Sequence, residues 1–450
     1  MKKRILAVAV AGLSGASFAQ SNVTISGQLR MGVESASAGG ATIANANMTS
    51  RTRVTDNGSN IRFAGEEGLG NGLTAWFQVE SVIGVAENQG TATAPVAGAA
   101  NSTSLGTRNT AVGIKGAWGN LFVGKWDAHY NSGNEVDTVN GADAFGSAAQ
   151  VLNITNTNGA AATATGRNAG DTFGGRQLNS IVFVTPSVSG FSAMLNYSTQ
   201  GESTTPLLSA KDRAWAFTPK YSNGPIQAFY SYWASDNVGT AAPTAGVTAS
   251  LTCINNATSA VTTGNATCTA GTTQIGGTAA VTAATGLGNK LRGNRLGGAY
   301  TFPMGLKIGL VWDRNKIETA DGSAGLAALG IAATGGNVAT HVRRERTAWA
   351  LPIQYVSGAH RVNLSFAKAA DIKTDVGTLA DSGAKLFVLG YEYTLSKRTS
   401  VAALYSSITN GANAAYDFRE SSASVAGTSG AGLSAGADPR VVQFSLRHVF

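Results

Sequence analysis

Residues 23–34 read Val-Thr-Ile-Ser-Gly-Gln-Leu-Arg-Met-Gly-Val-Glu, and this stretch decides the fold. From Val23 to Val33 every second residue is apolar or glycine, whereas from Thr24 to Glu34 every second residue is polar or glycine. Because successive side chains on a strand point to opposite faces, the pattern predicts a β-strand with one apolar and one wet side. About ten residues, rising roughly 3.3 Å each and tilted near 45°, climb roughly 23 Å, which is close to the apolar band of a transmembrane barrel.

The same alternation recurs along most of the chain, although the segments 177–186 and 384–394 alternate poorly. The sequence predicts sixteen strands, near residues 22–35, 59–67, 72–83, 107–116, 120–127, 177–186, 190–199, 213–222, 225–234, 293–302, 306–317, 345–356, 360–370, 384–394, 399–408 and 440–450. An even number of strands lets a single antiparallel chain close into a barrel with both ends on one side. The predicted fold class is therefore all-β, a transmembrane antiparallel β-barrel.

The predicted connections fall into two lengths. Short turns rich in Gly, Asn and Pro, such as 68–72, 222–225 and 303–305, supply the backbone angles of tight turns. Between them lie long polar stretches near 36–58, 85–106, 128–175, 200–212, 235–292, 318–344, 371–383 and 409–439. Long extracellular loops and short periplasmic turns are typical of outer-membrane barrels. The alternative, a soluble β-sandwich, usually has strands of about five or six residues, and such long loops are uncommon in compact soluble domains.

The beginning of the chain predicts export. Lys2, Lys3 and Arg4 precede a short apolar stretch, and Ser17-Phe18-Ala19 fits a small-residue cleavage site, so residues 1–19 are expected to be a signal peptide and 20–450 the barrel. Only 13% of residues are charged and the net charge is +8, of which three charges lie in the expected signal peptide. No dense basic stripe with interleaved aromatic residues is present, so nucleic acid is not an expected partner.

Several segments resemble the trimeric general porins of Gram-negative bacteria, particularly the beta-proteobacterial type. The start of the first strand, Asn22–Gly27, is similar to that family's first strand, and Gly65–Leu73 resembles its first periplasmic turn. Asn179–Ile181 followed by Pro186–Phe191 resembles a strand and turn in the middle of the family's barrel, and Gly390–Thr399 is close to a family signature. These matches span the mature chain, although the loops match little.

The resemblance implies a sixteen-stranded homotrimer in the outer membrane that lets small hydrophilic solutes and ions diffuse passively. It implies contact with outer-membrane lipid and lipopolysaccharide. Phe450, with apolar residues at alternate positions before it, resembles the signal read by the barrel-assembly machinery. The third long loop, here about 128–175, is expected to fold into the barrel and narrow the pore.

Fixed charges in the lumen are the candidate selectivity residues. A charge facing lipid would cost about 2–4 kcal/mol at mid-bilayer, so strand charges are expected to point inward. The expected constriction has arginines on the wall facing carboxylates of the third loop, with a mild anion preference. The predicted pore-lining set is Arg30, Arg62, Arg108, Lys125 and Arg176 on the basic side, and Asp127, Glu135, Asp137, Asp143 and Asp171 on the acidic side. Of these, the resemblance supplies Arg176 and Lys125, whereas Asn60 and Ala64 depart from basic positions of the family.

Other chemistry finds little support. Cys253 and Cys268 can close a disulfide in an oxidising compartment, and two free thiols are the alternative. The four histidines lack metal-ligand spacing, so neither a metal nor a cofactor is expected. Residues 119–125 match a phosphate-loop spacing, but Trp126 follows where a hydroxyl is required. Residues 432–436 fit a hydrolase elbow by composition alone. A substrate-selective channel, and less favourably an outer-membrane barrel enzyme, are the alternative functions.

Overall fold

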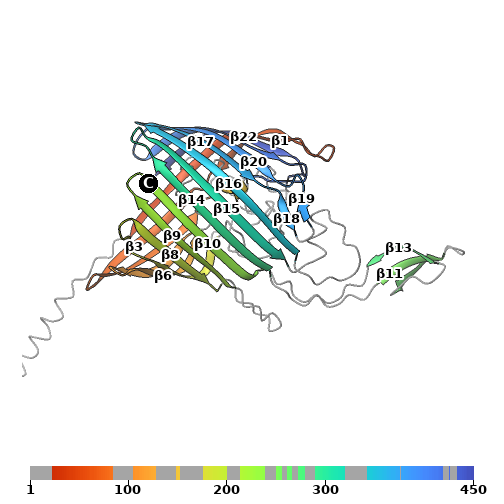
Figure 1. Ribbon diagram of the computed structural model, residues 1–450, viewed down its shortest axis with the longest axis horizontal. Coiled ribbons are helices and arrows are strands. Elements are labelled where there is room, and N and C mark those ends of the chain that lie inside the picture. The colour runs from red at the N-terminus through yellow and green to blue at the C-terminus, as the bar shows by residue number, and fades with distance from the viewer. Residues whose placement is uncertain are drawn as a thin grey trace, which may run out of the picture.

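In the computed structural model, the strands form one closed antiparallel β-barrel (Figure 1). The structure describes residues 23–84, 105–127, 148–152, 176–199, 213–238, 250–255, 261–265, 272–278, 289–319, 342–374, 377–418, 425 and 433–450. The wall consists of β1 (Thr24–Gly39), β2 (Met48–Asp56), β3 (Asn60–Gly70), β4 (Leu73–Val82), β5 (Thr110–Gly116), β6 (Gly119–Asp127), β7 (Arg176–Val184), β8 (Phe191–Ser198), β9 (Arg213–Asn223), β10 (Ile226–Val238), β14 (Asn289–Thr301), β15 (Leu306–Thr319), β16 (Val342–Ser357), β17 (His360–Ala369), β20 (Ala384–Thr394), β21 (Thr399–Asn410) and β22 (Asp438–Val449).

The first and last strands close the wall. β22 pairs with β1 from Gln28↔Val449 to Gly39↔Asp438. β2 and β3 pair with successive parts of β1, so they are two halves of one interrupted wall strand. Counted in this way the barrel has sixteen strands, and the predicted fold class is confirmed. Among the described residues, no helix is long and apolar enough to cross a membrane.

Successive side chains along a wall strand alternate between exposed and buried. On β1, Val33 is 52% exposed and Glu34 1%; on β22, Phe444 is 66% exposed and Gln443 1%. The apolar side chains point away from the barrel axis, as a lipid-facing surface requires, and the polar ones point into the lumen. The same alternation decides whether a charged side chain on a wall strand faces the lumen or the outer surface.

The seam between the chain ends depends on a glycine. Gly27 N donates to Phe450 O at 3.0 Å, and Phe450 N donates to Gly27 O at 3.1 Å. A Cβ on Gly27 would lie 2.3 Å from Asn60 O and 2.7 Å from the Phe450 ring. A side chain at position 27 would therefore force β3 or the terminal phenylalanine away from β1.

The second wall strand is longer than the sequence predicts. Residues 36–58, expected to be a connection, contain β2 and the end of β1. A break at Asn57–Ser59 separates β2 from β3, and Asp56 Oδ1 closes it by accepting from the backbone N–H groups of Gly58 and Ser59, each at 2.7 Å. β2 is rich in Ser, Thr and Arg on both faces, so it lacks the apolar alternation that marks a lipid-facing strand.

The two rims of the barrel differ. On one rim, the short-turn rim, the connections are 71–72, 117–118, 185–190, 224–225, 302–305, 358–359 and 395–398. On the other, the long-loop rim, they are 40–47, 83–109, 128–175, 199–212, 239–288, 320–341, 370–383 and 411–437. The short connections therefore lie on one rim and the longer ones on the other, as the sequence predicts.

Three small elements lie outside the wall. Helix α2 (Ala149–Leu152) belongs to the connection 128–175, and the strands β18 (Ile372–Thr374) and β19 (Gly377–Leu379) form a hairpin in the connection 370–383. A separate three-stranded sheet contains β11 (Ser250–Asn255), β12 (Val261–Asn265) and β13 (Thr272–Thr278). Cys253 lies in β11, but Cys268 and the expected signal peptide lie outside the described residues, so the disulfide and the cleavage site stay predictions.

Candidate functional site: the barrel lumen

The lumen-facing side of the described strands is predominantly basic. Charges in the middle of a strand are tolerated only where water reaches them, and among the described lumen-facing residues the basic ones outnumber the acidic ones. The basic residues are Arg30, Arg51, Arg53, Arg62, Lys115, Lys220, Arg295, Lys307, Arg344, Arg346, Arg361 and Arg447, and the acidic ones are Glu34, Glu66, Glu80, Asp313 and Glu392. Further cations and Asp127 lie where the wall meets the long-loop rim.

Three arginines on adjacent strands form what we call the basic patch: Arg62 on β3, Arg30 on β1 and Arg447 on β22. Arg30 lies opposite Arg447 in register, and Arg62 lies opposite Ser26. Arg62 Nε donates to Ser26 Oγ at 3.1 Å, and Arg447 Nε donates to Gln28 Oε1 at 2.9 Å. Within the described part of the chain, neither Arg62 nor Arg447 has an ion pair. The field of these two cations is therefore available to ions in the lumen.

A second group, the rim cluster, lies where β4 to β7 meet the long-loop rim. Arg108 Nε donates to Glu80 Oε1 at 2.5 Å, and Arg176 Nε lies 3.3 Å from Asp127 Oδ1. The Asn109 side chain joins both members of the second pair, because its Oδ1 accepts from Arg176 Nε at 3.0 Å and its Nδ2 donates to Asp127 Oδ2 at 3.0 Å. Each arginine is thus matched by a wall carboxylate.

Aromatic side chains support the rim cluster from the lumen side of β4 and β6. Trp76, Phe122 and Trp126 pack edge to face, with centroids 4.7 Å apart for Phe122–Trp126 and 5.2 Å for Trp76–Phe122. The register between β6 and β7 shifts between Gly124 and Trp126, where two residues of β7, Leu178 and Asn179, lie opposite Lys125, so the extra residue of this bulge belongs to β7. Lys125 Nζ donates to Thr107 O at 2.7 Å. Trp126 keeps the lumen-facing phase of Phe122 and Gly124 on β6.

The opposite wall holds buried arginines instead of open ones. On β14, Arg295 is 1% exposed and its Nε donates at 2.8 Å to Asp313 Oδ2 on β15, which is fully buried. Arg346 on β16 is also 1% exposed, and its two terminal nitrogens donate to Tyr416 OH at 2.6 Å and to Leu152 O at 2.5 Å. Arg295 therefore links β14 to β15, and Arg346 links β16 to two long connections.

Two long connections enter the lumen against this wall. Helix α2 contacts β16, β17 and β20, although its connection leaves the wall at β6 and returns at β7. In the connection 411–437, Tyr416 and Phe418 are buried in the same apolar cluster as Val151 and Leu152 of α2. Arg51 Nη2 on β2 donates to Val425 O of this connection.

The predicted pore residues are placed as follows. Arg30 and Arg62 face the lumen, as their position in the alternation predicts, and Arg108 and Arg176 lie together in the rim cluster with Lys125. Asp127, expected in the third loop, is instead the last residue of β6, opposite Arg176, because pairing with β7 continues to that point. The remaining expected loop acids, Glu135, Asp137, Asp143 and Asp171, lie outside the described residues.

Sequence reasoning missed Glu80, Arg447, Arg295 and Arg346. For Arg447 the signal was present, since it follows Gln443 and Ser445 on the wet face of the last strand. Glu80 and Arg295 also had a readable inward phase. Nothing in the sequence could have paired Arg346 with Tyr416 and Leu152, because these contacts join parts of the chain 70 and 194 residues apart.

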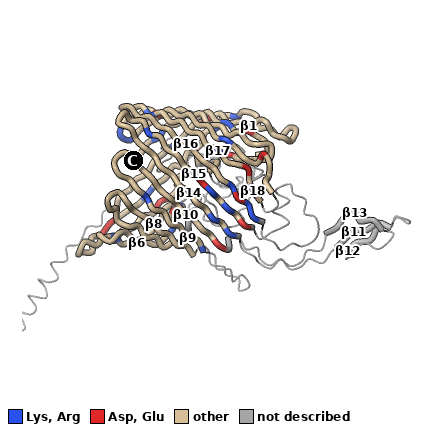
Figure 2. The backbone as a smooth tube through the Cα atoms, in the orientation of Figure 1, with Lys and Arg blue, Asp and Glu red and all other residues tan. Residues whose placement is uncertain are grey.

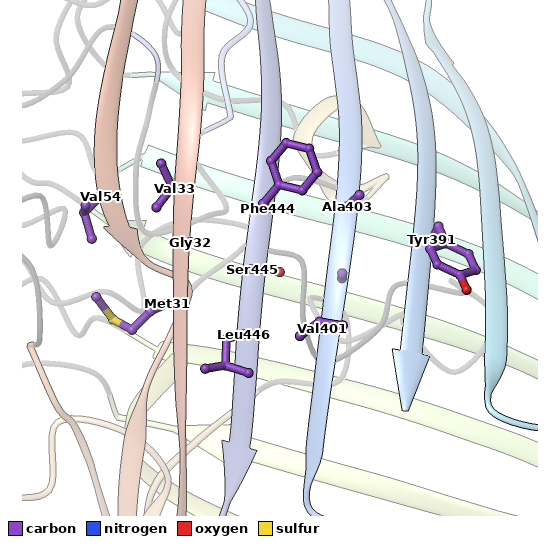
Figure 3. A pocket seen from close by; sticks show the side chains of 11 residues that line it. Met31, Gly32, Val33, Val54, Tyr391, Val401, Ala403, Phe444, Ser445 and Leu446 are labelled. Carbon is purple, nitrogen blue, oxygen red and sulfur yellow. The ribbon is translucent and has the colours of Figure 1, made fainter. Parts of the chain in front are cut away.

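The outer surface has two contrasting regions. An apolar groove, lined by outward-facing Met31, Val33, Val401, Ala403 and Phe444, runs over β1, β2 and β20 to β22 (Figure 3). Elsewhere, charged residues gather near the strand ends that lead to the long-loop rim (Figure 2), and those with the outward phase form what we call the outer charged belt. Its cations are Arg213, Lys290, Arg292, Arg314, Lys316, Arg343, Lys368, Lys373, Lys385 and Arg440, and its carboxylates are Asp236, Glu318 and Glu345.

Comparison with known proteins identifies the family. The family profile described as Gram-negative porin matches residues 6–289 and 263–413. The chain belongs to the Gram-negative porin family. This porin is accordingly an outer-membrane β-barrel protein, as the sequence predicts.

Individual relatives cover less of this porin. The major outer membrane protein P.IB of Neisseria meningitidis serogroup A is 35% identical over 129 residues, which are 28% of this chain and 34% of that protein. The P.IB protein of Neisseria sicca is 32% identical over 153 residues, 33% of this chain and 38% of that protein. The matched region thus spans only about a third of these relatives.

Solved structures support the fold over nearly the full length. The anion-selective porin from Comamonas acidovorans superposes with a TM-score of 0.61 at 20% identity, covering 96% of this chain and 100% of that chain. OmpT, an outer membrane protein of Vibrio cholerae, gives a TM-score of 0.56 at 13% identity, covering 97% and 100%. At these identities the likeness establishes the closed barrel.

Proposed function

We propose that this porin forms a water-filled channel for passive diffusion of small hydrophilic solutes and ions, with a mild preference for anions. The basic patch carries the proposal, because Arg62 and Arg447 face the lumen with only neutral hydrogen-bond partners among the described residues. A channel lined by unmatched cations lowers the energy of an anion in the lumen and raises that of a cation. The anion-selective porin of similar fold supports the same direction.

The channel acts without catalysis, metal or cofactor. Solutes move down their gradients, and the wall contributes only width and fixed charge. The long-loop rim is placed outside the cell and the short-turn rim in the periplasm, following the general rule for such barrels. The basic patch, near the beginning of β1 and the end of β22, then lies toward the periplasmic side.

Planar-bilayer recording of the purified protein tests the channel function. We expect stepwise conductance increases, and we expect proteoliposomes to swell in solutions of small sugars at rates that fall with sugar size. Permeation should not saturate with solute concentration, which distinguishes a diffusion channel from a substrate-selective one. Well-folded, inserted protein that conducts nothing would refute the proposal.

We propose that residues 128–175 narrow this channel. The contact of α2 with β16, β17 and β20 supports the proposal, because the connection must cross the lumen from β6 to reach them. Asp127 and Arg176 of the rim cluster lie where this connection leaves and rejoins the wall. Glu135, Asp137, Asp143 and Asp171 belong to the same connection and would add carboxylates opposite the basic wall.

We propose a homotrimer that buries the apolar groove. The groove residues Val401 and Ala403 are small, and no charged side chain lines the groove, as an interface between barrels within a membrane requires. Substituting Ala403 with Trp should dissociate the trimer in native mass spectrometry. The matched change Leu310→Trp, on the outward face of β15, should leave the trimer intact; equal behaviour of both variants would place the interface elsewhere.

Lipopolysaccharide is the proposed partner of the outer charged belt. Ten cations against three carboxylates, just beyond the outward-facing Trp312 and Trp349, suit the phosphates of the outer leaflet. On β1 and β4 the corresponding positions are Ser35, Ser37 and Ser81, so the belt is one-sided.

Replacing belt cations tests this partner. The triple change Lys368→Ser, Lys385→Ser and Arg440→Ser should weaken binding of purified lipopolysaccharide in a native-gel shift. Changing Lys397 and Arg398 in the short turn 395–398 should have no such effect. Unaltered binding by the belt variant would remove the belt from lipid recognition.

Export and assembly complete the proposal. Residues 1–19 are proposed to be the signal peptide, and Phe450 part of the signal for the barrel-assembly machinery. Phe450 also completes the seam with Gly27. Phe450→Ala should therefore reduce the amount of heat-modifiable barrel in the outer membrane, whereas the nearby outward-facing change Val442→Ala should not.

A further inference from the structure

Arg346 is the point at which two long connections meet the wall. Its guanidinium donates through Nη2 to Leu152 O in the connection 128–175 and through Nη1 to Tyr416 OH in the connection 411–437. Its Cζ also lies 5.5 Å from the centre of the Tyr416 ring, a cation–π distance. One side chain therefore binds two segments that are 264 residues apart, Leu152 and Tyr416.

The neighbouring strand β15 also binds the carbonyl of Leu152. Asn315 on β15 lies directly opposite Arg346, and its Nδ2 donates to the same Leu152 O at 3.0 Å. Asp313 accepts from Asn315 and from Arg295, which orients the amide. The last carbonyl of α2 therefore receives two donors from adjacent strands, which satisfies an otherwise unpaired helix-end group.

The second connection is fastened on both sides of Tyr416. Asn410, at the end of β21, donates to Tyr416 O at 3.0 Å and accepts from Tyr416 N at 2.9 Å. Asp417 Oδ1 accepts from the N–H groups of Phe418 and Val425 at 2.8 and 2.9 Å. Val425 O in turn accepts from Arg51 on β2. Along the wall, β2 and β16 are six strand pairings apart, so the connection spans a wide arc of the lumen.

The charge of Arg346 is buried at this attachment. Within the described residues Arg346 has no ion pair, and it is stabilised by a carbonyl, a hydroxyl and an aromatic ring. A buried guanidinium in such surroundings gives up much of its hydration, which it would regain if the connections moved away. Replacing Arg346 with a neutral residue therefore weakens the contacts with Leu152 and with Tyr416 at once.

We propose that Arg346 is a positioning residue that holds the connections 128–175 and 411–437 against β16 as one unit, so that both together set the width of the channel. The inference rests on the proposed channel function. It adds a second connection to the constriction and assigns the residue that couples it to the first.

Single-channel conductance and sugar permeation of variants test the proposal. Arg346→Gln and Tyr416→Phe should each raise unitary conductance, by on the order of twofold for Arg346→Gln, because the pore lining sets conduction. The double variant should gain no more than Arg346→Gln alone, since both changes break the same contact. The largest permeating sugar should increase in parallel.

Two controls separate positioning from other roles. Arg398→Gln removes a charge in the short turn 395–398, and Tyr405→Phe changes an outward-facing tyrosine; both should conduct like the wild type. Tyr416→Phe removes only a hydroxyl, so it remains informative if Arg346→Gln fails to fold. A shift of reversal potential in Arg346→Gln without any conductance change in Tyr416→Phe would make Arg346 a selectivity charge and overturn the proposal.

The failures of the two proposals are distinguishable. A wild-type protein that does not conduct refutes the channel function. A conducting wild type whose folded Arg346→Gln and Tyr416→Phe variants keep its conductance and sugar limit refutes the positioning role.

Discussion

The basic patch and the buried arginines of β14 and β16 occupy the same kind of place, the lumen-facing side of a strand, yet their surroundings differ. Among the described residues, Arg62 and Arg447 have one neutral hydrogen-bond partner each, and both face the lumen. Arg295 and Arg346 are 1% exposed and lie under protein. Under the proposed function, an inward-pointing arginine contributes to selectivity only where nothing covers it; where a connection folds over it, the arginine binds that connection to the wall instead.

The largest expected effect is on stability at the covered wall. Arg295→Ala leaves the carboxylate of Asp313 buried without its cation, which costs about 3–5 kcal/mol for a broken buried pair. We expect a clear fall in the temperature at which the barrel loses heat-modifiable migration. The double change Arg295→Met with Asp313→Leu should recover most of this loss, and a fully stable Arg295→Ala would contradict the comparison.

The open wall should show the reverse behaviour. Replacing Arg62 and Arg447 together with Ser removes two solvated charges, so the unfolding free energy should change by less than about 1 kcal/mol. Anion preference, measured as reversal potential in a salt gradient, should fall. Arg398→Ser, in the short turn 395–398, is the matched control and should leave the potential unaltered.

The rim cluster should give the smallest shift. Arg108 and Arg176 are matched by Glu80 and Asp127, so the field of each pair partly cancels. Changing both arginines to Ser should lower anion preference less than changing the basic patch. Glu80→Gln should raise anion preference slightly, because the change leaves Arg108 without its carboxylate partner. A fall in anion preference in this variant would show that pairing with Glu80 does not weaken the field of Arg108.

These differences also explain what the sequence could and could not predict. Alternation with period two places Arg30 and Arg62 inward and predicts a strand at 360–370, where the structure has β17 at His360–Ala369, because lipid-facing and water-facing side chains take turns along the strand. β2 was missed, because Met48–Asp56 is polar on both faces and carries no such contrast. The alternation says which way Arg346 points but not what covers it.

Whether an inward-facing arginine is covered by protein depends on tertiary contacts between segments that are distant in the sequence. Tyr416 lies in a Gly-, Ala- and Ser-rich stretch with no periodicity, and Leu152 in another, so nothing local indicates that both approach β16. The same limit applies to Asp127, whose carboxylate was expected on the third loop and lies at the end of β6. Charge and phase are therefore readable from the sequence, whereas the distinction between an open and a covered arginine required the fold.

The most direct test of this account is the reversal potential of single channels in a salt gradient, recorded for the wild type and for the Arg62→Ser, Arg447→Ser variant. The account predicts a wild-type potential with the sign of anion preference, and a variant of equal conductance class whose potential moves toward zero. A cation-preferring wild type, or a variant with the wild-type potential, would contradict the claim that the uncovered arginines of the basic patch set selectivity.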